Sequence, residues 1–286
     1  MPIDPSVAKG AHLSSRVISW TATDVLLYNI AVGAGSDPLD LERLRFAYEK
    51  DLQVLPTFAT SVPDFRDTEP PRITFPGIDV DLLRVVLGIQ SLTVFRPIPV
   101  AATVIVRERI ADVFDKGSGA IIARETNVYD LDGEPMWTST MNIFAKGEGG
   151  FGGSRGPFTR VDIPERSPDF TVDTRTLPQQ ALLFRLCGDR NPMHADPVVA
   201  RAQGFEYPFL HGLGIYGIIG RVLVEDVLAC DSTRLRSWTA RFVAPVRPGE
   251  TLRTLAWATD YGYLVRVLSL ERNTPVLEDG ILIARN

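Results

Sequence analysis

The sequence predicts an α+β fold in which two similar units follow one another along the chain. Residues 91–146 form a block of β-branched runs separated by turn signals, and the same rhythm returns after residue 235. The segments that precede the two blocks have helical rather than strand-like patterns. A glycine-rich stretch divides the chain nearly in half. Together, these observations indicate a duplicated unit with helices first and strands last.

The length, composition and net charge of the chain limit the classes of protein to which it can belong. The 286 residues suit two domains of ordinary size, at about 100 to 200 residues per domain. Apolar residues make up 45% of the chain and charged residues 23%, a balance that permits a substantial buried core. The net charge of −5 argues against a nucleic-acid partner, because binding one requires a concentrated excess of Lys and Arg on one face.

The first half is predicted to be one domain that covers residues 1–148. Its strands are separated by turn signals at residues 115–119 and 130–133. Residues 79–88 stand where the second half has its long apolar helix, so a much shorter central helix is expected there. His12 lies in an N-terminal arm without a recognisable pattern and is assigned no role.

Residues 149–168 are predicted to be a linker between the two domains. Residues 147–157 are rich in glycine, and prolines punctuate residues 162–168. The glycines at 147, 149 and 152 match the G-x-G-x-x-G spelling of a dinucleotide site. We reject that interpretation because the run is not followed by a helix within a strand–turn–helix unit.

The second domain is predicted to cover residues 169–286. Residues 212–228 are apolar on nearly all sides, which is typical of a helix that other elements must bury. The natural cover is a block of strands, expected at residues 238–246, 250–259, 264–272 and 275–284. Four glycines in this helix each lower its propensity by about 1 kcal/mol relative to alanine, which predicts the close approach of a sheet or a ligand.

The most informative segment of the sequence is the Gly-Asp-Arg-Asn-Pro-Met-His run at residues 188–194. Asp189 and His194 are five residues apart, about 140° around an ideal helix, so they cannot share a helical face. They can meet across a turn, which the intervening Asn-Pro pair favours. The Asp-Pro pair at residues 196–197 is predicted to cap a short helix that ends at Gly204. The two titratable side chains would therefore lie on a rigid, capped loop.

This segment resembles the hydratase 2 motif of MaoC-like enzymes, which reads Gly-Asp-x-Asn-Pro-x-His and continues through Asp-Pro and Gly-Phe to a His-Gly dipeptide. Runs at residues 21–24, 54–59, 115–119 and 242–251 look like the same family, so the resemblance spans nearly the whole chain. It implies two tandem hot-dog domains, each an antiparallel sheet wrapped around a central helix, with the catalytic loop in the second. The shortened helix in the first domain would leave a cavity for acyl chains.

The resemblance further implies a (3R)-specific enoyl-CoA hydratase, which adds water across the 2,3 double bond of an acyl thioester in fatty-acid or sterol side-chain β-oxidation. Hydration needs a base for water, an acid for the α-carbon and donors for the enolate-like oxygen. The implied catalytic residues are Asp189, His194, Asn191 and Gly212.

Each of these residues has an expected role. His194 is the expected base, because its ordinary pKa near 6.5 suits proton exchange at neutrality. Asp189 needs a pKa raised by burial to act as an acid, and which of the two protonates carbon stays open. Gly212 would contribute its amide at the positive end of the helix. Asn191 would orient His194 or the water.

Three other functions fit part of the pattern. A dehydratase would use the same residues in the opposite direction, on a (3R)-hydroxyacyl thioester in lipid biosynthesis. A hot-dog thioesterase would also use an acid, a water and a helix-end amide, but the loop resembles that of hydratases more closely. A non-catalytic acyl-CoA-binding subunit would be expected to lack Asp189 or His194, and both are present.

Several other residues are assigned no catalytic role. His211 is expected to fix the loop rather than to act on substrate. Four cations could meet CoA phosphates, but solvated surface charge is the simpler interpretation of each: Arg96, Lys116, Lys146 and Arg155. Residues 87–90 read Leu-Gly-Ile-Gln where eukaryotic-like members of the family usually read His-Gly-Glu-Gln, a departure that concerns how the first half binds substrate and CoA.

The sequence also bears on cofactors, partners and location. No cofactor or metal site is recognisable, and the expected partner is the acyl-CoA substrate, with a homodimer compatible with the fold. Four ionisable residues interrupt the longest apolar stretch, residues 209–228, which argues against a membrane span. Cys187 and Cys230 are expected to be buried thiols, because they lack the spacing of a metal site or disulfide framework. Without an export signal or a peroxisomal address, the protein is expected to be cytoplasmic.

Overall fold

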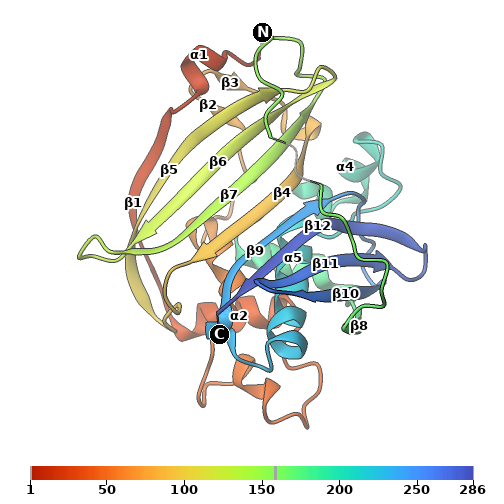
Figure 1. Cartoon of the computed structure of the whole chain (residues 1–286). Helices are drawn as coiled ribbons and strands as arrows, with labels where there is room; N and C mark the ends of the chain where they lie inside the picture. The colour runs from red at the N-terminus through yellow and green to blue at the C-terminus, as the bar shows by residue number, and fades with distance from the viewer. Residues whose placement is uncertain (1, 158–159, 286) are drawn as a thin grey trace.

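The computed structural model describes residues 2–157 and 160–285, and one large antiparallel sheet dominates it (Figure 1). Met1, Asn286 and two residues of the predicted linker, Phe158 and Thr159, lie outside the described residues. The strands, in chain order, are β1 (His12–Trp20), β2 (Thr74–Phe75), β3 (Ile78–Asp79), β4 (Val85–Val94), β5 (Ala102–Asp115), β6 (Gly119–Tyr129), β7 (Pro135–Lys146), β8 (Phe170–Arg175), β9 (Leu235–Phe242), β10 (Thr251–Thr259), β11 (Gly262–Ser269) and β12 (Thr274–Ala284). The helices are α1 (Pro5–Ala8), α2 (Ala22–Ala31), α3 (Gln180–Phe184), α4 (Pro197–Ala202) and α5 (Gly212–Val222), the last continued by a π-helical turn at Leu223–Val227.

The order of the strands confirms the predicted duplication. Ten strands are hydrogen-bonded in the order β1-β5-β6-β7-β4-β9-β12-β11-β10-β8, and each neighbouring pair is antiparallel. The last five strands repeat the first five in mirrored order, so β4 and β9 meet at the centre while β1 and β8 form the edges. Ser91 pairs with Thr239 across this central junction. The two halves therefore share one continuous sheet.

The strands of the second half follow the predicted pattern. The four strands expected after residue 235 are present as β9 to β12, each within four residues of its expected bounds. The turn between β11 and β12 contains Asn273 at a φ of 48°, a left-handed conformation that asparagine tolerates better than most residues. In this half the sheet wraps around α5, as expected of a hot-dog domain (Figure 1).

Two expectations about the first half are wrong. Residues 79–88 form no central helix, because a single 3-10 turn at Leu82–Arg84 leads directly into β4, which includes Gly88. The β-branched residues at the start of β4 suit a strand, and Val85 already pairs with Ala145 of β7. The N-terminal arm is also a strand, because His12 begins β1, which pairs with β5.

A small hairpin takes the place of the missing helix. The two short strands β2 and β3 pair with each other, and Ile78 packs into a hydrophobic cluster with sheet residues such as Val113 and Ile122. The hairpin covers one end of the first half's sheet (Figure 1). The neighbouring face of β4 and β7 stays open and becomes a wall of the cavity described below.

Two glycines of α5 are explained by contacts with the first half of the chain. A side chain at Gly217 would come within 2.6 Å of the hydroxyl oxygen of Tyr28, in α2. A side chain at Gly220 would overlap Thr57, in the 3-10 turn at Pro56–Thr60. The close approach predicted from the sequence is therefore made by a helix and a turn of the first half, rather than by a sheet or a ligand at these two positions.

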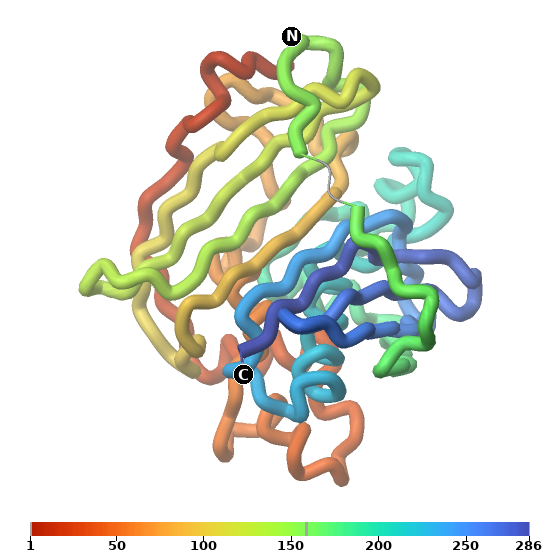
Figure 2. The backbone as a smooth tube through the Cα atoms, viewed as in Figure 1, coloured from red at the N-terminus to blue at the C-terminus, as the bar shows by residue number. Residues whose placement is uncertain are grey.

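The connection between the halves joins the end of β7 at Lys146 to the start of β8 at Phe170. Of its described parts, residues 147–157 lie at one end of the first half's sheet and residues 160–169 lie beside the second half's strands (Figure 2). The amides of Gly150 and Gly152 donate hydrogen bonds to Asp115, at 2.9 and 2.7 Å, so they are not open to a nucleotide phosphate. The exact domain boundaries at residues 148 and 169 stay predictions.

No helix in the described ranges is both long enough and apolar enough to cross a membrane. The main hydrophobic core is formed by both halves together, with Trp20, Tyr28 and Trp137 from the first and Tyr216 and Trp238 from the second. The hydroxyl of Tyr216 donates a hydrogen bond to the backbone carbonyl of Trp238, at 2.6 Å, and so ties α5 to β9.

We predict that Tyr216→Phe lowers the free energy of unfolding by about 1–3 kcal/mol, because a buried carbonyl loses its donor. The matched control is Tyr261→Phe, whose side chain is about half exposed. It should change stability by less than about 0.5 kcal/mol. Urea denaturation followed by fluorescence would measure both, and equal midpoints for the two variants would contradict the assigned role of the Tyr216 hydroxyl.

Candidate active site

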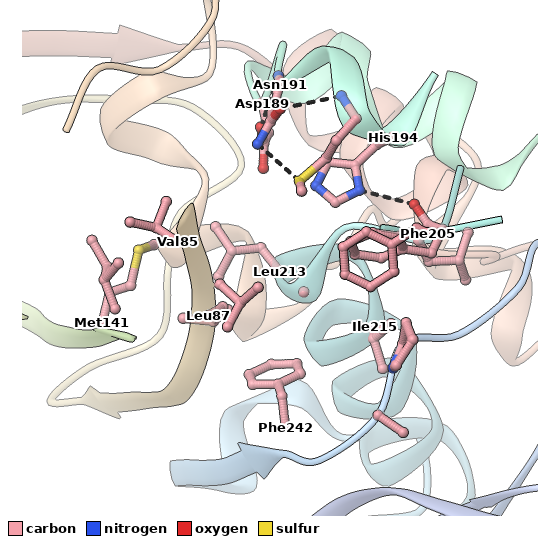
Figure 3. A pocket seen from close by; sticks show the side chains of 18 of the residues that line it. Val85, Leu87, Met141, Asp189, Asn191, His194, Phe205, Leu213, Ile215 and Phe242 are labelled. Atoms are coloured by element: carbon pink, nitrogen blue, oxygen red, sulfur yellow. Dashed lines mark hydrogen bonds between the residues drawn. The ribbon is translucent and has the colours of Figure 1, made fainter. Parts of the chain in front are cut away.

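A cavity of about 280 Å³ lies between the two halves, and the predicted catalytic residues line one side of it (Figure 3). Asp189, Asn191 and His194 face it from the loop before α4, and Gly212 faces it from the start of α5. The remaining wall is largely apolar: Ile73, Val85, Val86, Leu87, Met141, Ile143, Met193, Phe205, Phe209, Leu210, Leu213, Ile215, Phe242, Val243, Ala244 and Pro245. The structure therefore brings all four predicted site residues together.

Local hydrogen bonds fix the catalytic loop. Asn191 caps a 3-10 turn at Pro192–His194, and its side-chain oxygen accepts from the amide of Met193 at 3.2 Å. Its side-chain nitrogen donates to the sulfur of the same methionine at 3.1 Å (Figure 3). Both hydrogen bonds lie within the turn that carries His194, and the structure shows none between the Asn191 side chain and the imidazole.

The short helix after the loop begins and ends as predicted. The carboxylate of Asp196 accepts from the amide of Val198 at 2.7 Å, with Pro197 in the first turn of α4. Gly204 follows the helix at a φ of 84°, a conformation that glycine adopts without steric cost. Capping at both ends limits how far the neighbouring loop can move.

The first half of the chain also contacts the loop that carries Asp189. Gly188 has a φ of 110°, and a side chain at this position would overlap the backbone carbonyl of Asp64. Two residues later, the guanidinium of Arg190 donates to the backbone carbonyl of Asp67 at 3.1 Å. Asp64 is itself held by Arg16, at 3.1 Å. The position of Asp189 is therefore set by contacts from both halves.

The two titratable residues have free atoms that face the cavity. Nδ1 of His194 lies 2.9 Å from the backbone carbonyl of Phe209, so Nδ1 carries the proton and Nε2 presents a lone pair. One carboxylate oxygen of Asp189 accepts from the amide of Asn191 at 3.2 Å. A carboxylate oxygen of Asp189 and a ring nitrogen of His194 lie within 4.8 Å of each other. A water molecule can therefore contact both groups at once.

Burial shifts both groups toward their neutral forms. Desolvation raises the pKa of Asp189 above its ordinary value, although the positive charge on protonated His194 opposes the shift. Desolvation lowers the pKa of His194, and the charge of Asp189 opposes this shift too. Part of Asp189 remains open to the cavity, whereas His194 is buried. Both shifts favour a protonated carboxyl group beside an unprotonated imidazole.

The start of α5 is placed to receive a partial negative charge. Gly212 is the first residue of the helix, where an amide has no carbonyl partner within the helix and carries part of the positive end of its dipole. Leu87 lies directly above it, because a side chain at Gly212 would come within 2.9 Å of the Leu87 Cδ2 atom. A larger residue at this position would have to displace Leu87, which also lines the cavity.

His211 lies behind the catalytic pair. Its Nε2 is 3.2 Å from the backbone carbonyl of Asp189, and its ring lies 4.0 Å from that of His194 with 35° between the planes. One ligand-type atom from each of Asp189, His194 and His211 lies within 4.8 Å of the other two. Nδ1 of His194 and Nε2 of His211 each face a backbone carbonyl oxygen, so neither of these two nitrogens offers a lone pair while its hydrogen bond holds.

The sequence predicted a cavity for acyl chains in the first half, but not the residues that form its apolar wall. Val85 and Leu87 of β4 and Met141 of β7 lie across the cavity from the loop that carries Asp189 and His194 (Figure 3). Ile143 of β7 also lines the cavity. Nothing in their local pattern distinguishes them from ordinary core residues. None of the four surface cations considered for CoA phosphates lines the cavity, and Arg96 instead pairs with Asp130 at 2.6 Å.

Comparisons with known proteins agree with this geometry. Residues 160–277 match the MaoC like domain, and residues 18–147 match the MFE-2 hydratase 2 N-terminal domain. The chain is 43% identical to enoyl-CoA hydratase ChsH3 of Mycobacterium tuberculosis, with 98% of each chain covered. It is 35% identical to the peroxisomal enoyl-CoA hydratase 2 of Arabidopsis thaliana, over 91% of this chain and 88% of that one. A MaoC-like dehydratase from Phytophthora capsici has a similar structure, with a TM-score of 0.84, 28% identity, and coverage of 97% and 96%.

We predict that Gly188→Ala lowers kcat by about 100-fold, because the added methyl group must displace the loop that carries Asp189. Gly204→Ala is the matched control, since Gly204 also has a positive φ but no atom lies within 4 Å of an added side chain. It should cost only backbone strain, about 1–2 kcal/mol of stability. Kinetics and thermal unfolding of both variants would test this, and equal activity in the two would contradict the proposed contact.

Proposed function

Because the chain belongs to the MaoC-like hydratase 2 family, we propose that it is a (3R)-specific enoyl-CoA hydratase that reversibly converts a trans-2-enoyl-CoA to a (3R)-3-hydroxyacyl-CoA. The family relationship supports the activity. The observation that carries the proposal is the cavity itself, in which Asp189, His194 and the Gly212 amide face an apolar wall. A polar end and an apolar end are what an acyl thioester requires.

We propose that the reaction begins at the Nε2 atom of His194. This lone pair accepts a proton from water as the water oxygen forms a bond to C3 of the substrate. The π electrons of the double bond move through C2 to the thioester oxygen, which becomes enolate-like. The Gly212 amide stabilises that oxygen by a hydrogen bond at the positive end of α5.

The second step returns the thioester and completes the addition. The enolate-like electron pair returns to C2, which takes the proton from the carboxyl group of Asp189, and the thioester carbonyl forms again. Asp189 then regains a proton from protonated His194, so the pair ends as it began. The raised pKa of Asp189 and the lowered pKa of His194 both favour this starting state.

The acyl chain is proposed to lie along the first half's sheet. Val85 and Leu87 from β4 and Met141 from β7 provide the apolar surface, in the region where no central helix fills the space. The CoA portion would extend out of the cavity, because about 280 Å³ is too small to hold both the acyl chain and CoA.

Several conditions of the reaction also remain proposals. We infer that hydration needs no metal or other cofactor, because a protonated acid and a neutral base suffice for the proton transfers. The net charge of −5 supports the absence of a nucleic-acid partner. Cytoplasmic location is supported by two buried free thiols, Cys187 and Cys230, which suit a reducing compartment. A homodimer stays a prediction that sedimentation of the purified chain would test.

The second candidate is a dehydratase that acts on a (3R)-hydroxyacyl thioester in lipid biosynthesis. The similar structure from Phytophthora capsici carries the name dehydratase, and the same residues serve both directions of a reversible reaction. The group that carries the acyl chain would distinguish the two candidates, because a biosynthetic enzyme would prefer a thioester of acyl carrier protein to a thioester of CoA. A non-catalytic acyl-CoA-binding subunit is disfavoured by the intact catalytic pair.

We predict that the purified protein removes the absorbance of the conjugated thioester when mixed with 2-enoyl-CoAs of graded size. His194→Ala and Asp189→Asn should each lower kcat by about 100- to 10,000-fold, the usual contribution of a general base or acid. His12→Ala is the control, since this exposed histidine lies on β1 and lines no part of the cavity. Wild-type binding of enoyl-CoA without turnover would move the assignment to a binding subunit.

The pH dependence should be bell-shaped. His194 acts as a base only when unprotonated, so kcat/KM should rise as pH increases through a pKa below about 6.5. Asp189 acts as an acid only when protonated, so kcat/KM should fall at higher pH, through a pKa raised above that of an ordinary carboxyl group. Because the two groups interact, the pKa values of the two limbs describe the Asp189–His194 pair and not either residue alone. A profile that lacks the alkaline limb would contradict the role of Asp189 as the acid.

A further inference from the structure

His211 is a buried residue that the proposed reaction does not use directly. It is fully inaccessible to solvent and occupies the position just before α5. Its own backbone carbonyl accepts from the amide of Ile215 at 2.9 Å, which is the first hydrogen bond of the helix. His211 is therefore attached to the helix end that presents the Gly212 amide.

The hydrogen bond to Asp189 fixes the protonation state of the His211 ring. A carbonyl oxygen can only accept, so Nε2, at 3.2 Å from the Asp189 carbonyl, must carry a proton. Nδ1 is buried without a hydrogen-bond partner among the described residues, and a second proton there would have no acceptor. Burial, with nearby His194 and Arg185, lowers the pKa of His211 well below its ordinary value. The ring is neutral, with one defined tautomer.

The rings around His194 hold it in place from two directions. His211 lies against one face, with 4.0 Å between ring centroids and 35° between planes. Phe209 meets it edge to face at 5.0 Å and 84°. His211 is in turn backed by Phe184, at 5.2 Å. The imidazole of His194 therefore has little freedom to tilt, and its Nε2 keeps one direction.

We propose that His211 is a positioning residue that holds three parts of the hydration site in one geometry: the Asp189 backbone, the His194 ring and the start of α5. This inference rests on the proposed hydratase activity. One side chain makes all three contacts, so a change at His211 should misplace the acid, the base and the oxyanion donor relative to one another, while the acyl wall stays intact.

Two substitutions separate the contacts. His211→Phe keeps a flat ring against His194 but loses the donor to Asp189, whereas His211→Gln keeps a donor but loses the ring. We expect kcat to fall by about 100-fold in His211→Phe, and by less in His211→Gln, because misplacement of reacting groups by about 1 Å has an effect of this size. KM for the enoyl-CoA should stay within about threefold of wild type, because uniform binding is unchanged.

The pH profile gives a readout that a purely structural role would not move. His211→Phe keeps His194 covered, so the acid limb of kcat/KM should stay where it is in wild type. His211→Gln lets water reach His194, so the pKa of His194 should rise and the acid limb should move to higher pH. His12→Gln is the control and should change neither kcat nor the profile. Wild-type kcat in both His211 variants would overturn the proposal.

A spectroscopic measurement on the wild-type protein guards against variants that fail to fold. The chain contains only three histidines, so their imidazole resonances can be assigned by substitution of His12 and His194. We expect His211 to show the Nε2-protonated tautomer and no titration between about pH 5 and 9, given an ordinary pKa near 6.5. The other tautomer, or titration in that range, would overturn the proposal. This measurement needs no substrate, so inactivity of wild type on every enoyl-CoA would count against the hydratase assignment alone.

Discussion

The pairing of β4 with β9 is the constraint on which the site depends. Ile89 lies opposite Arg241 and Thr93 opposite Ser237, so two separate sheets become one. This register places the strand that carries Leu87 beside the strand that ends at Phe242, and both residues line the cavity. Neither half contains a complete site, because the second supplies the polar groups and the first supplies much of the apolar wall.

Desolvation then determines the chemistry that the loop can perform. On a solvated loop, Asp189 would be an anion and His194 would be partly protonated at neutral pH. The shared core desolvates both groups, which raises the pKa of Asp189 and lowers the pKa of His194. The loop thus holds a carboxyl group and an imidazole that are both shifted toward their neutral forms. Desolvation is unfavourable for polar side chains, and the contacts made by Gly188 and His211 hold the loop in place despite this cost.

The sequence was informative where structure is local. The caps at Asn191 and Asp196, the turn that joins Asp189 to His194 and the helix after His211 depend on residues a few positions apart, so their spacing could be interpreted directly. A cavity in the first half was predicted, but the residues that line it could not be, because they depend on sheet register and on the lack of a helix before β4. Nor could the contact of Gly188 with Asp64, because it joins residues that are distant in the chain.

The missing helix of the first half also bears on symmetry. Two identical subunits that paired through their sheets would each carry the same helix. Shortening that helix would then open a cavity in both subunits and would remove core packing beneath the loops of both. Joining the two copies in one chain removes this requirement. One copy can give up its helix to enlarge a cavity, while the other keeps the helix whose first residue lines that cavity. The larger cavity comes with a single site where a symmetric pair would have two.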